Sequence, residues 1–74
     1  MQIVEVDWVD SCSNDGWFHR KEAEQHSVSF CKSVGYLVKK NRKEVVLAGQ
    51  SSDTGNVGGL MAIPRKCVRS IRKI

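Results

Sequence analysis

The chain has 74 residues, of which 41% are hydrophobic, and a formal net charge of +4. This length predicts a single domain, residues 1–74, near the lower limit for an independent hydrophobic core, with a globular rather than a disordered composition. No stretch approaches the ~18 apolar residues of a membrane span, and the first residues lack the basic and apolar regions of a signal peptide.

The cysteines and histidines are scattered along the chain. Cys12, Cys31 and Cys67 are odd in number and widely spaced, which favours free thiols in a reducing cytoplasm over a disulfide framework. We therefore expect a cytoplasmic protein. No Cys-x-x-Cys pair is present, and His19 and His26 lie in no recognised arrangement with a nucleophile, so we expect no metal, no cofactor and no enzymatic activity.

Charge is divided unequally along the sequence. Residues 1–31 carry two basic and six acidic side chains, a net charge of −4, whereas residues 32–74 carry ten basic and two acidic ones, a net charge of +8. The basic half suits an anionic ligand such as a nucleotide or nucleic acid. Two alternatives remain open: acidic and basic faces meet between copies of the chain, or the charges form an ordinary solvated surface.

The first predicted elements are a strand and a short helix. Residues 3–9 alternate Val4, Val6 and Trp8 against acidic residues, which predicts a strand with one buried face. Turn-forming residues at 10–16 end this strand. Residues 20–26 contain good helix formers but few apolar side chains, so we expect one or two helical turns on the surface.

The strongest structural signal is a hairpin around Asn41, with strands on either side of a polar turn. Asn41 suits a tight turn because it tolerates a positive φ, and Gly35 is expected to mark a bend or bulge in the first strand. The alternating apolar residues predict one buried face, consisting of Val28, Phe30, Val34, Tyr36 and Val38, with Val45 and Leu47 opposite.

Beyond the hairpin, residues 49–59 are predicted to form a polar, glycine-rich loop and residues 60–63 a short strand that ends at Pro64. Residues 65–74 fit either a short basic amphipathic helix or a turn followed by a last strand. The predicted core of the whole chain consists of Val4, Val6, Trp8, Phe30, Tyr36, Val38, Val45, Leu47, Ile63, Val68 and Ile71.

This order of elements resembles an SH3-type barrel. In such barrels a Gly-(small apolar)-Ile-Pro segment ends the fourth strand, a 3₁₀ turn follows, and the last strand closes the sheet. Residues 59–64, 65–67 and 68–71 match these parts. The resemblance implies an all-β protein with one short helix, folded as a small five-stranded SH3-like barrel. The acidic residues and paired Trp of SH3 domains that bind proline-rich peptides are not found at matching places, so that function does not follow.

The sequence also resembles a broad set of small phage and prophage proteins. The matching segments are residues 6–10 (Val-x-Trp-x-Asp), residues 16–17 (Gly-Trp), residues 33–38 (Ser-Val-Gly-Tyr-Leu-Val) and residues 63–65 (Ile-Pro-Arg). Proteins similar to these include phage counter-defence proteins that sequester nucleotide immune signals. The resemblance implies a phage-encoded viral protein with an anti-defence role in the host cytoplasm.

Three segments are candidates for contacting such a ligand. Trp17 could stack a base, with His19 and Arg20 beside it, although core packing is an alternative role for Trp17. Ser51, Thr54 and Asn56 belong to the glycine-rich loop, which could turn backbone N–H groups toward a phosphate or could simply connect two strands. Arg65 and Lys66 are the best candidates for anion contacts, because Arg offers planar, bidentate phosphate recognition.

Three functions follow from these features. The first is a phage-encoded, non-enzymatic binding protein that sequesters a small anionic nucleotide at a site shared within a homo-oligomer. Self-association is expected from the marginal size of the domain and its opposed charges. The second is a nucleic-acid-binding accessory protein that uses the basic C-terminal half, and the third is an interaction module that inhibits a host protein.

Overall fold

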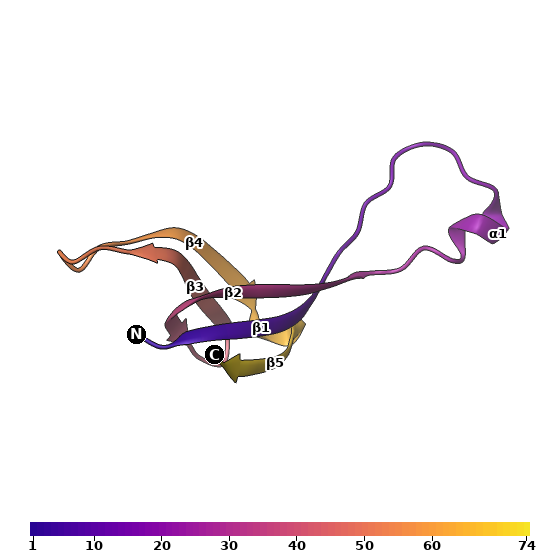
Figure 1. The fold of residues 1–74 in the computed structure, drawn as a ribbon. Coiled ribbons are helices and arrows are strands. Elements are labelled where there is room, and N and C mark those ends of the chain that lie inside the picture. The colour runs from indigo at the N-terminus through magenta and orange to yellow at the C-terminus, as the bar shows by residue number, and fades with distance from the viewer.

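A computed structural model describes residues 1–74 and shows a chain made mainly of strands (Figure 1). Two short helical elements interrupt them: the helix α1 (Arg20–Ala23) and the 3₁₀ turn η1 (Arg65–Cys67). The strands are β1 (Ile3–Asp10), β2 (Ser29–Lys40), β3 (Glu44–Ser51), β4 (Val57–Pro64) and β5 (Val68–Lys73). None of the helices is long and apolar enough to cross a membrane.

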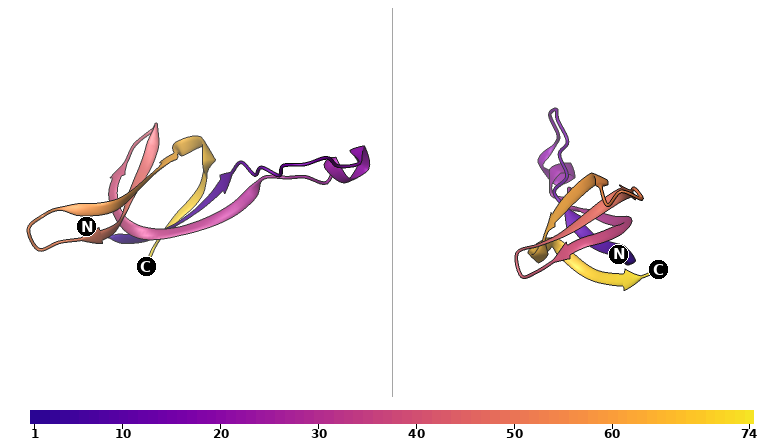
Figure 2. Two further views of the ribbon diagram at one scale, coloured as in Figure 1. Left: turned by 90° about the horizontal axis from the view of Figure 1, so that it is seen from above. Right: turned by 90° about the vertical axis from the view of Figure 1, so that its left-hand side faces the viewer.

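The five strands form one antiparallel sheet in the order β4-β3-β2-β1-β5. The predicted set of strands is therefore confirmed, and residues 65–74 form a turn and a strand rather than a helix. The sheet is strongly curved (Figure 2), but its edge strands β4 and β5 are not hydrogen-bonded to each other. The sheet is therefore open.

The core lies inside this curve. Five buried side chains form it, namely Val4, Val6, Val45, Leu47 and Ile63, and Trp8, Leu37, Cys67, Val68 and Ile71 pack against them. Ser33 on β2 connects β1 to the edge strand β4, because its hydroxyl accepts a hydrogen bond from Trp8 Nε1 at 2.9 Å and lies 3.7 Å from the sulfur of Met61. These contacts confirm most of the predicted core and show β4 folded back toward β1 and β2.

The predicted buried face of β2 is wrong. Phe30 is 68% exposed, Val28, Val34 and Val38 are also exposed, and Tyr36 is only half-buried. The ladder explains why: Val4 pairs with Gly35, so the small residues of β2 share the inward face with the apolar residues of β1. A shift of one residue along a strand exchanges its two faces. The apolar residues of β2 do alternate with other residues, but they lie on the outer face of the sheet and not on the buried one.

Gly35 lies where β2 changes partners. Residues 29–36 of β2 pair with β1, and residues 36–40 pair with β3, with a register shift between Leu37 and Lys39. A Cβ atom on Gly35 would lie 2.7 Å from the carbonyl oxygen of Ala48. The predicted irregularity is thus confirmed as a close approach of β3 to β2 that no side chain could occupy, followed by a bulge.

Two extensions give the molecule an elongated shape, 54 × 21 × 21 Å, with a radius of gyration of 15.9 Å. A compact chain of this length would measure about 11 Å. Residues 11–28, here called the arm, project from one end of the sheet, and the β3–β4 hairpin projects from the other (Figure 1). The arm carries α1, which is shorter than the predicted 20–26 helix and has no buried residue.

The predicted 49–59 loop is mostly strand. Only residues 52–56, here called the hairpin tip, connect β3 to β4. Gly49 and Gly59 face each other across the hairpin, with a φ of 63° at Gly59. Glycine adopts this left-handed conformation at no steric cost. The polar, glycine-rich composition therefore reflects a solvated and kinked hairpin rather than an irregular loop.

Candidate anion-binding site

The β2–β3 turn presents a row of basic side chains to solvent. Its geometry comes from Asn41, whose Oδ1 accepts hydrogen bonds at 2.9 Å from the backbone N–H groups of Lys43 and Glu44. The predicted positive φ is wrong, since no residue other than glycine has one. Asn41 instead shapes the turn through its side chain. Lys40, Arg42 and Lys43 are exposed as a result.

The turn η1 lies beside this row. Glu44 pairs with Pro64 across the β3–β4 ladder, and the N–H of Arg65 donates to the carbonyl of Lys43 at 2.9 Å. The structure therefore gathers five cations from two distant segments, here called the basic cluster: Lys40, Arg42, Lys43, Arg65 and Lys66. The two segments lie side by side in both views of Figure 2.

One carboxylate borders the basic cluster, and it is already paired. Glu44 Oε2 lies 3.0 Å from Lys39 Nζ. The hydrogen bond from Lys39 and the charges of Lys39 and Lys43 hold the pKa of Glu44 below its usual value, although partial desolvation acts in the opposite direction. Glu44 therefore stays ionised at neutral pH and is neutralised by Lys39, which leaves the five cations in excess.

Arg65 is the most constrained member of the basic cluster. Its side chain is partly buried, and its Nη1 nitrogen is shielded from solvent with no hydrogen-bond acceptor in the protein. A buried charged donor without an acceptor costs ~1–3 kcal/mol or more. An anion could contact this nitrogen only if the Arg65 side chain moved from its position in this structure, and the contact would then remove that cost.

The structure places Trp17, His19 and Arg20 on the arm. Trp17 is fully exposed, so the alternative that it packs in the core is wrong. His19 caps α1, its Nδ1 accepting from the N–H of Lys21 at 3.4 Å, and Arg20 pairs with Glu24 at 3.6 Å. These three residues lie on a different part of the molecule from the basic cluster.

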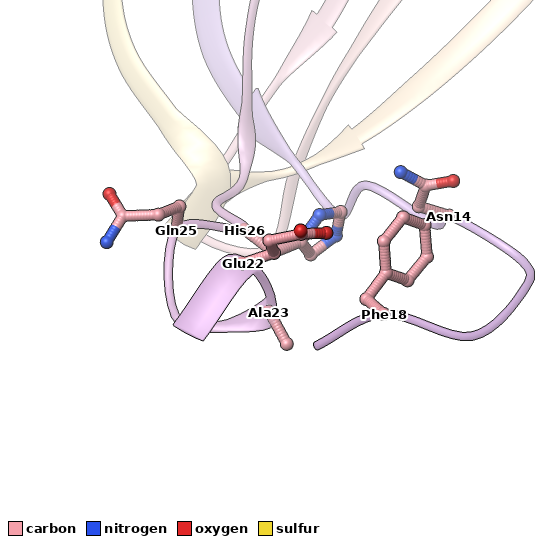
Figure 3. A pocket seen from close by; sticks show the side chains of 6 residues that line it. All are labelled: Asn14, Phe18, Glu22, Ala23, Gln25 and His26. Carbon is pink, nitrogen blue, oxygen red and sulfur yellow. The ribbon is translucent and has the colours of Figure 1, made fainter. Parts of the chain in front are cut away.

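The arm also contains a pocket of about 470 Å³. Figure 3 shows Phe18 on one side of it and residues of α1 on the other. A hydrogen-bond contact of 2.7 Å between His26 Nε2 and the carbonyl of Cys12 closes the base of the arm. The pocket holds a single acidic side chain, Glu22, and no Lys or Arg, so it does not suit an anion.

Ser51, Thr54 and Asn56 lie at the opposite end, beside or within the hairpin tip. The N–H groups of Ser52, Gly55 and Asn56 donate within the tip, at 2.8, 3.2 and 3.2 Å, and the hydroxyls of Ser52 and Thr54 are 2.8 Å apart. These groups satisfy one another, so the predicted cradle of outward N–H groups is not formed by them. A shallow pocket of about 240 Å³ lies alongside.

Within one chain, then, the predicted residues do not meet. Arg65 and Lys66 lie together, whereas the arm and the hairpin tip are at opposite ends (Figure 1). Lys40, Arg42 and Lys43 are part of the candidate site but were not among the residues predicted for it. Their basic run was visible, but only the pairing of Glu44 with Pro64 brings it next to Arg65.

The thiols and the other metal-ligating side chains form no further site. Cys12 is exposed, Cys31 and Cys67 are half-buried, and all three are free. No three His, Cys, Asp or Glu side chains lie close enough to hold a metal ion together. No protein-family model, curated protein or solved structure matches this chain.

Proposed function

We propose that the chain is a non-enzymatic binding protein that takes a small anionic nucleotide at the basic cluster and acts as a homo-oligomer in a host cytoplasm. The observation that carries this proposal is the 2.9 Å hydrogen bond from the N–H of Arg65 to the carbonyl of Lys43, which sets η1 and its two cations beside the basic β2–β3 turn. A phosphate group is a strong partner for a guanidinium group, because two of its oxygens accept paired charge-assisted hydrogen bonds.

The surroundings of Arg65 support the same ligand class. Lys66 follows Arg65 in the sequence, and the backbone of Lys43 lies against that of Arg65 in the fold. The carboxylate of Glu44, next to Lys43, is neutralised by Lys39. The resemblance to phage counter-defence proteins directs the proposal toward nucleotide immune signals. We also propose that the curved sheet, with a 3₁₀ turn before its last strand, is a variant of the SH3-like barrel.

Calorimetric titration with cyclic dinucleotides and cyclic ADP-ribose isomers tests the ligand. Arg65→Ala should weaken binding by about 1.5–3 kcal/mol, the scale of a lost charged hydrogen bond, without lowering the melting temperature. Arg65→Lys should recover only part of the affinity, because an ammonium group lacks the planar fork. Arg72→Ala is the matched control, since it removes the same charge from a residue that pairs with Glu5 on β1.

A second function is favoured by the exposure of Lys40, Arg42, Lys43 and Lys66. Exposed cations in a row suit the phosphate backbone of duplex DNA, and such binding falls steeply with salt. The absence of heat with every nucleotide, together with salt-sensitive retardation of duplex DNA, would replace the first proposal with this one.

A further inference from the structure

One edge of the sheet is open and carries no charge. β4 lies at the edge, and none of its eight residues is ionisable. Leu60 is 63% exposed and Met61 is 42% exposed. An edge strand presents unpaired N–H and C=O groups, and proteins usually guard such an edge with Lys, Pro or a bulge. Here Pro64 guards only the last position, and Leu60, Met61 and Ala62, which follow the kink at Gly59, are exposed.

We propose that β4 pairs with β4 of a second copy, antiparallel and about a two-fold axis near Leu60 and Met61. Charge selects this direction. Between residues 45 and 64, Asp53 is the one charged side chain, and Arg65 and Lys66 follow directly. Antiparallel pairing sets Arg65 and Lys66 near the partner's Asp53. Parallel pairing would set like charges beside each other at both ends, which is destabilising.

The pairing assembles residues that one chain keeps apart. The first and last residues of β4 are seven residues apart, which separates them by ~23 Å. Full overlap of the two strands sets Val57 opposite the partner's Pro64, so Arg65 falls beside the partner's Asn56. Each basic cluster then faces the partner's hairpin tip, with its Ser51, Thr54 and Asn56, and the pocket beside it.

This shared site rests on the proposed function: the nucleotide lies between Arg65 of one copy and the hairpin tip of the other. Lys66 compensates the charge of the partner's Asp53, so Arg65 and Lys43 retain the positive charge that the phosphates require. The hairpin tip contributes hydroxyl and amide side chains, which bind ribose and base edges. Two identical sites result, one at each end of the paired strands.

The first experiment measures mass by light scattering at high micromolar concentration. Wild-type protein should have twice the chain mass of 8.3 kDa. Leu60→Lys should give the single-chain mass, because the symmetry sets two lysines close together at the axis. Val34→Lys is the matched control, because Val34 is 57% exposed on the inner strand β2, and it should remain a dimer. Circular dichroism must show both variants folded.

Amide hydrogen exchange locates the contact. Protection of residues 57–63 should fall on dilution, while protection of β5 stays constant. A wild-type protein that is monomeric, or a folded Leu60→Lys variant that stays dimeric, overturns the proposal. A mass of three or more copies with added protection in β5 also overturns it, in favour of a β4-to-β5 contact.

Titration of the nucleotide that wild-type protein binds separates the shared site from the proposed function. The monomeric Leu60→Lys variant should lose at least tenfold in affinity, and Val34→Lys should lose none. Wild-type affinity in the monomer overturns the shared site and leaves the Arg65 site standing. A dimer that binds no nucleotide overturns the proposed function and the shared site, and it supports the edge pairing.

Discussion

The two edges of the sheet differ in how they meet solvent. β5 carries Arg69, Arg72 and Lys73, and two of these contact side chains of β1 or β2. The guanidinium of Arg72 lies 3.1 Å from Glu5, and that of Arg69 lies 5.2 Å from the ring centroid of Phe30. β4 has no charged residue and no such contact. A sheet with one cationic edge and one bare edge is protected against pairing on one side only.

The strands behind the edges differ as well. β5 rests on β1, and Glu5 and Asp7 of β1 form a small charged network with Lys32 and Arg72 on the outer face of the sheet. β4 rests on β3, whose contribution is apolar: Val45, Leu47 and Ala48 are all buried. We conclude that the β5 side depends partly on charge and the β4 side on packing, which the following substitutions separate.

Leu47→Ala should have the largest effect. Leu47 is 3% exposed within the core, and truncating a buried Leu costs ~2–5 kcal/mol, a large share of the stability of a small domain. Chemical denaturation measures the loss. Val46→Ala, at a half-buried position of the same strand, is the control. Native-state hydrogen exchange should show β4 losing more protection than β5, and equal losses would contradict the comparison.

Gly35→Ala should come next, because it acts at the junction between the two sides. The added Cβ would meet the Ala48 carbonyl at 2.7 Å and Leu47 Cβ at 3.3 Å. Overpacking of this kind costs ~1–3 kcal/mol. The urea midpoint should fall accordingly. Gly55→Ala tests the opposite case: the added Cβ would have open space around it, but the backbone has a φ of 88°, which an L side chain rarely adopts. If Gly35→Ala were as stable as wild type, the close approach would carry no energetic weight.

Arg72→Ala should cost less than ~1 kcal/mol, because its ion pair with Glu5 is largely exposed on the Arg side. The loss should shrink as salt is added, since mobile ions screen exposed charges. Thermal melts at low and high ionic strength measure this. A loss that does not depend on salt would show that Arg72 acts through packing.

The smallest expected effect is a change in the pKa of Glu44. The lowered pKa of Glu44 means that its carboxylate adds stability above the pKa of the unfolded chain, and that this stability is lost as the pH falls through the lower folded pKa. Lys39→Ala should raise the pKa of Glu44 toward its usual value of 4.5. Carboxyl chemical shifts followed by NMR give the titration, and Lys73→Ala should leave that pKa unchanged.

The sequence predicted the strands better than their faces. Val4 and Val6 were placed correctly, because they alternate with charged residues. On β2, alternation identified Phe30 and Val34 as sharing a face but could not show which face was buried. Gly35 determines which face of β2 is buried, because only a residue without a side chain fits where β3 approaches β2. That close approach is visible in the fold and not in the sequence.

The candidate site was predicted in part, for a similar reason. Arg65 was predicted from the phosphate-binding chemistry of its guanidinium group, whereas Arg42 and Lys43 join it through a ladder between residues distant in sequence. The polar residues 49–59 were interpreted as a loop, because Gly, Ser and Asn are typical of turns. They extend two strands instead: Gln50 pairs with Gly58 and Ser51 with Val57, so only residues 52–56 remain as a turn.

The arm affects how the sequence of this chain can change during evolution. It leaves the sheet after Asp10 and re-enters at Ser29, residues that pair directly across the β1–β2 ladder. Its residues 11–28 bury nothing in the body of the protein. Natural selection can therefore lengthen, shorten or rewrite this segment while the sheet folds as before. Relatives of this protein should differ most in the arm, and a peptide tag or a second small domain can be inserted there.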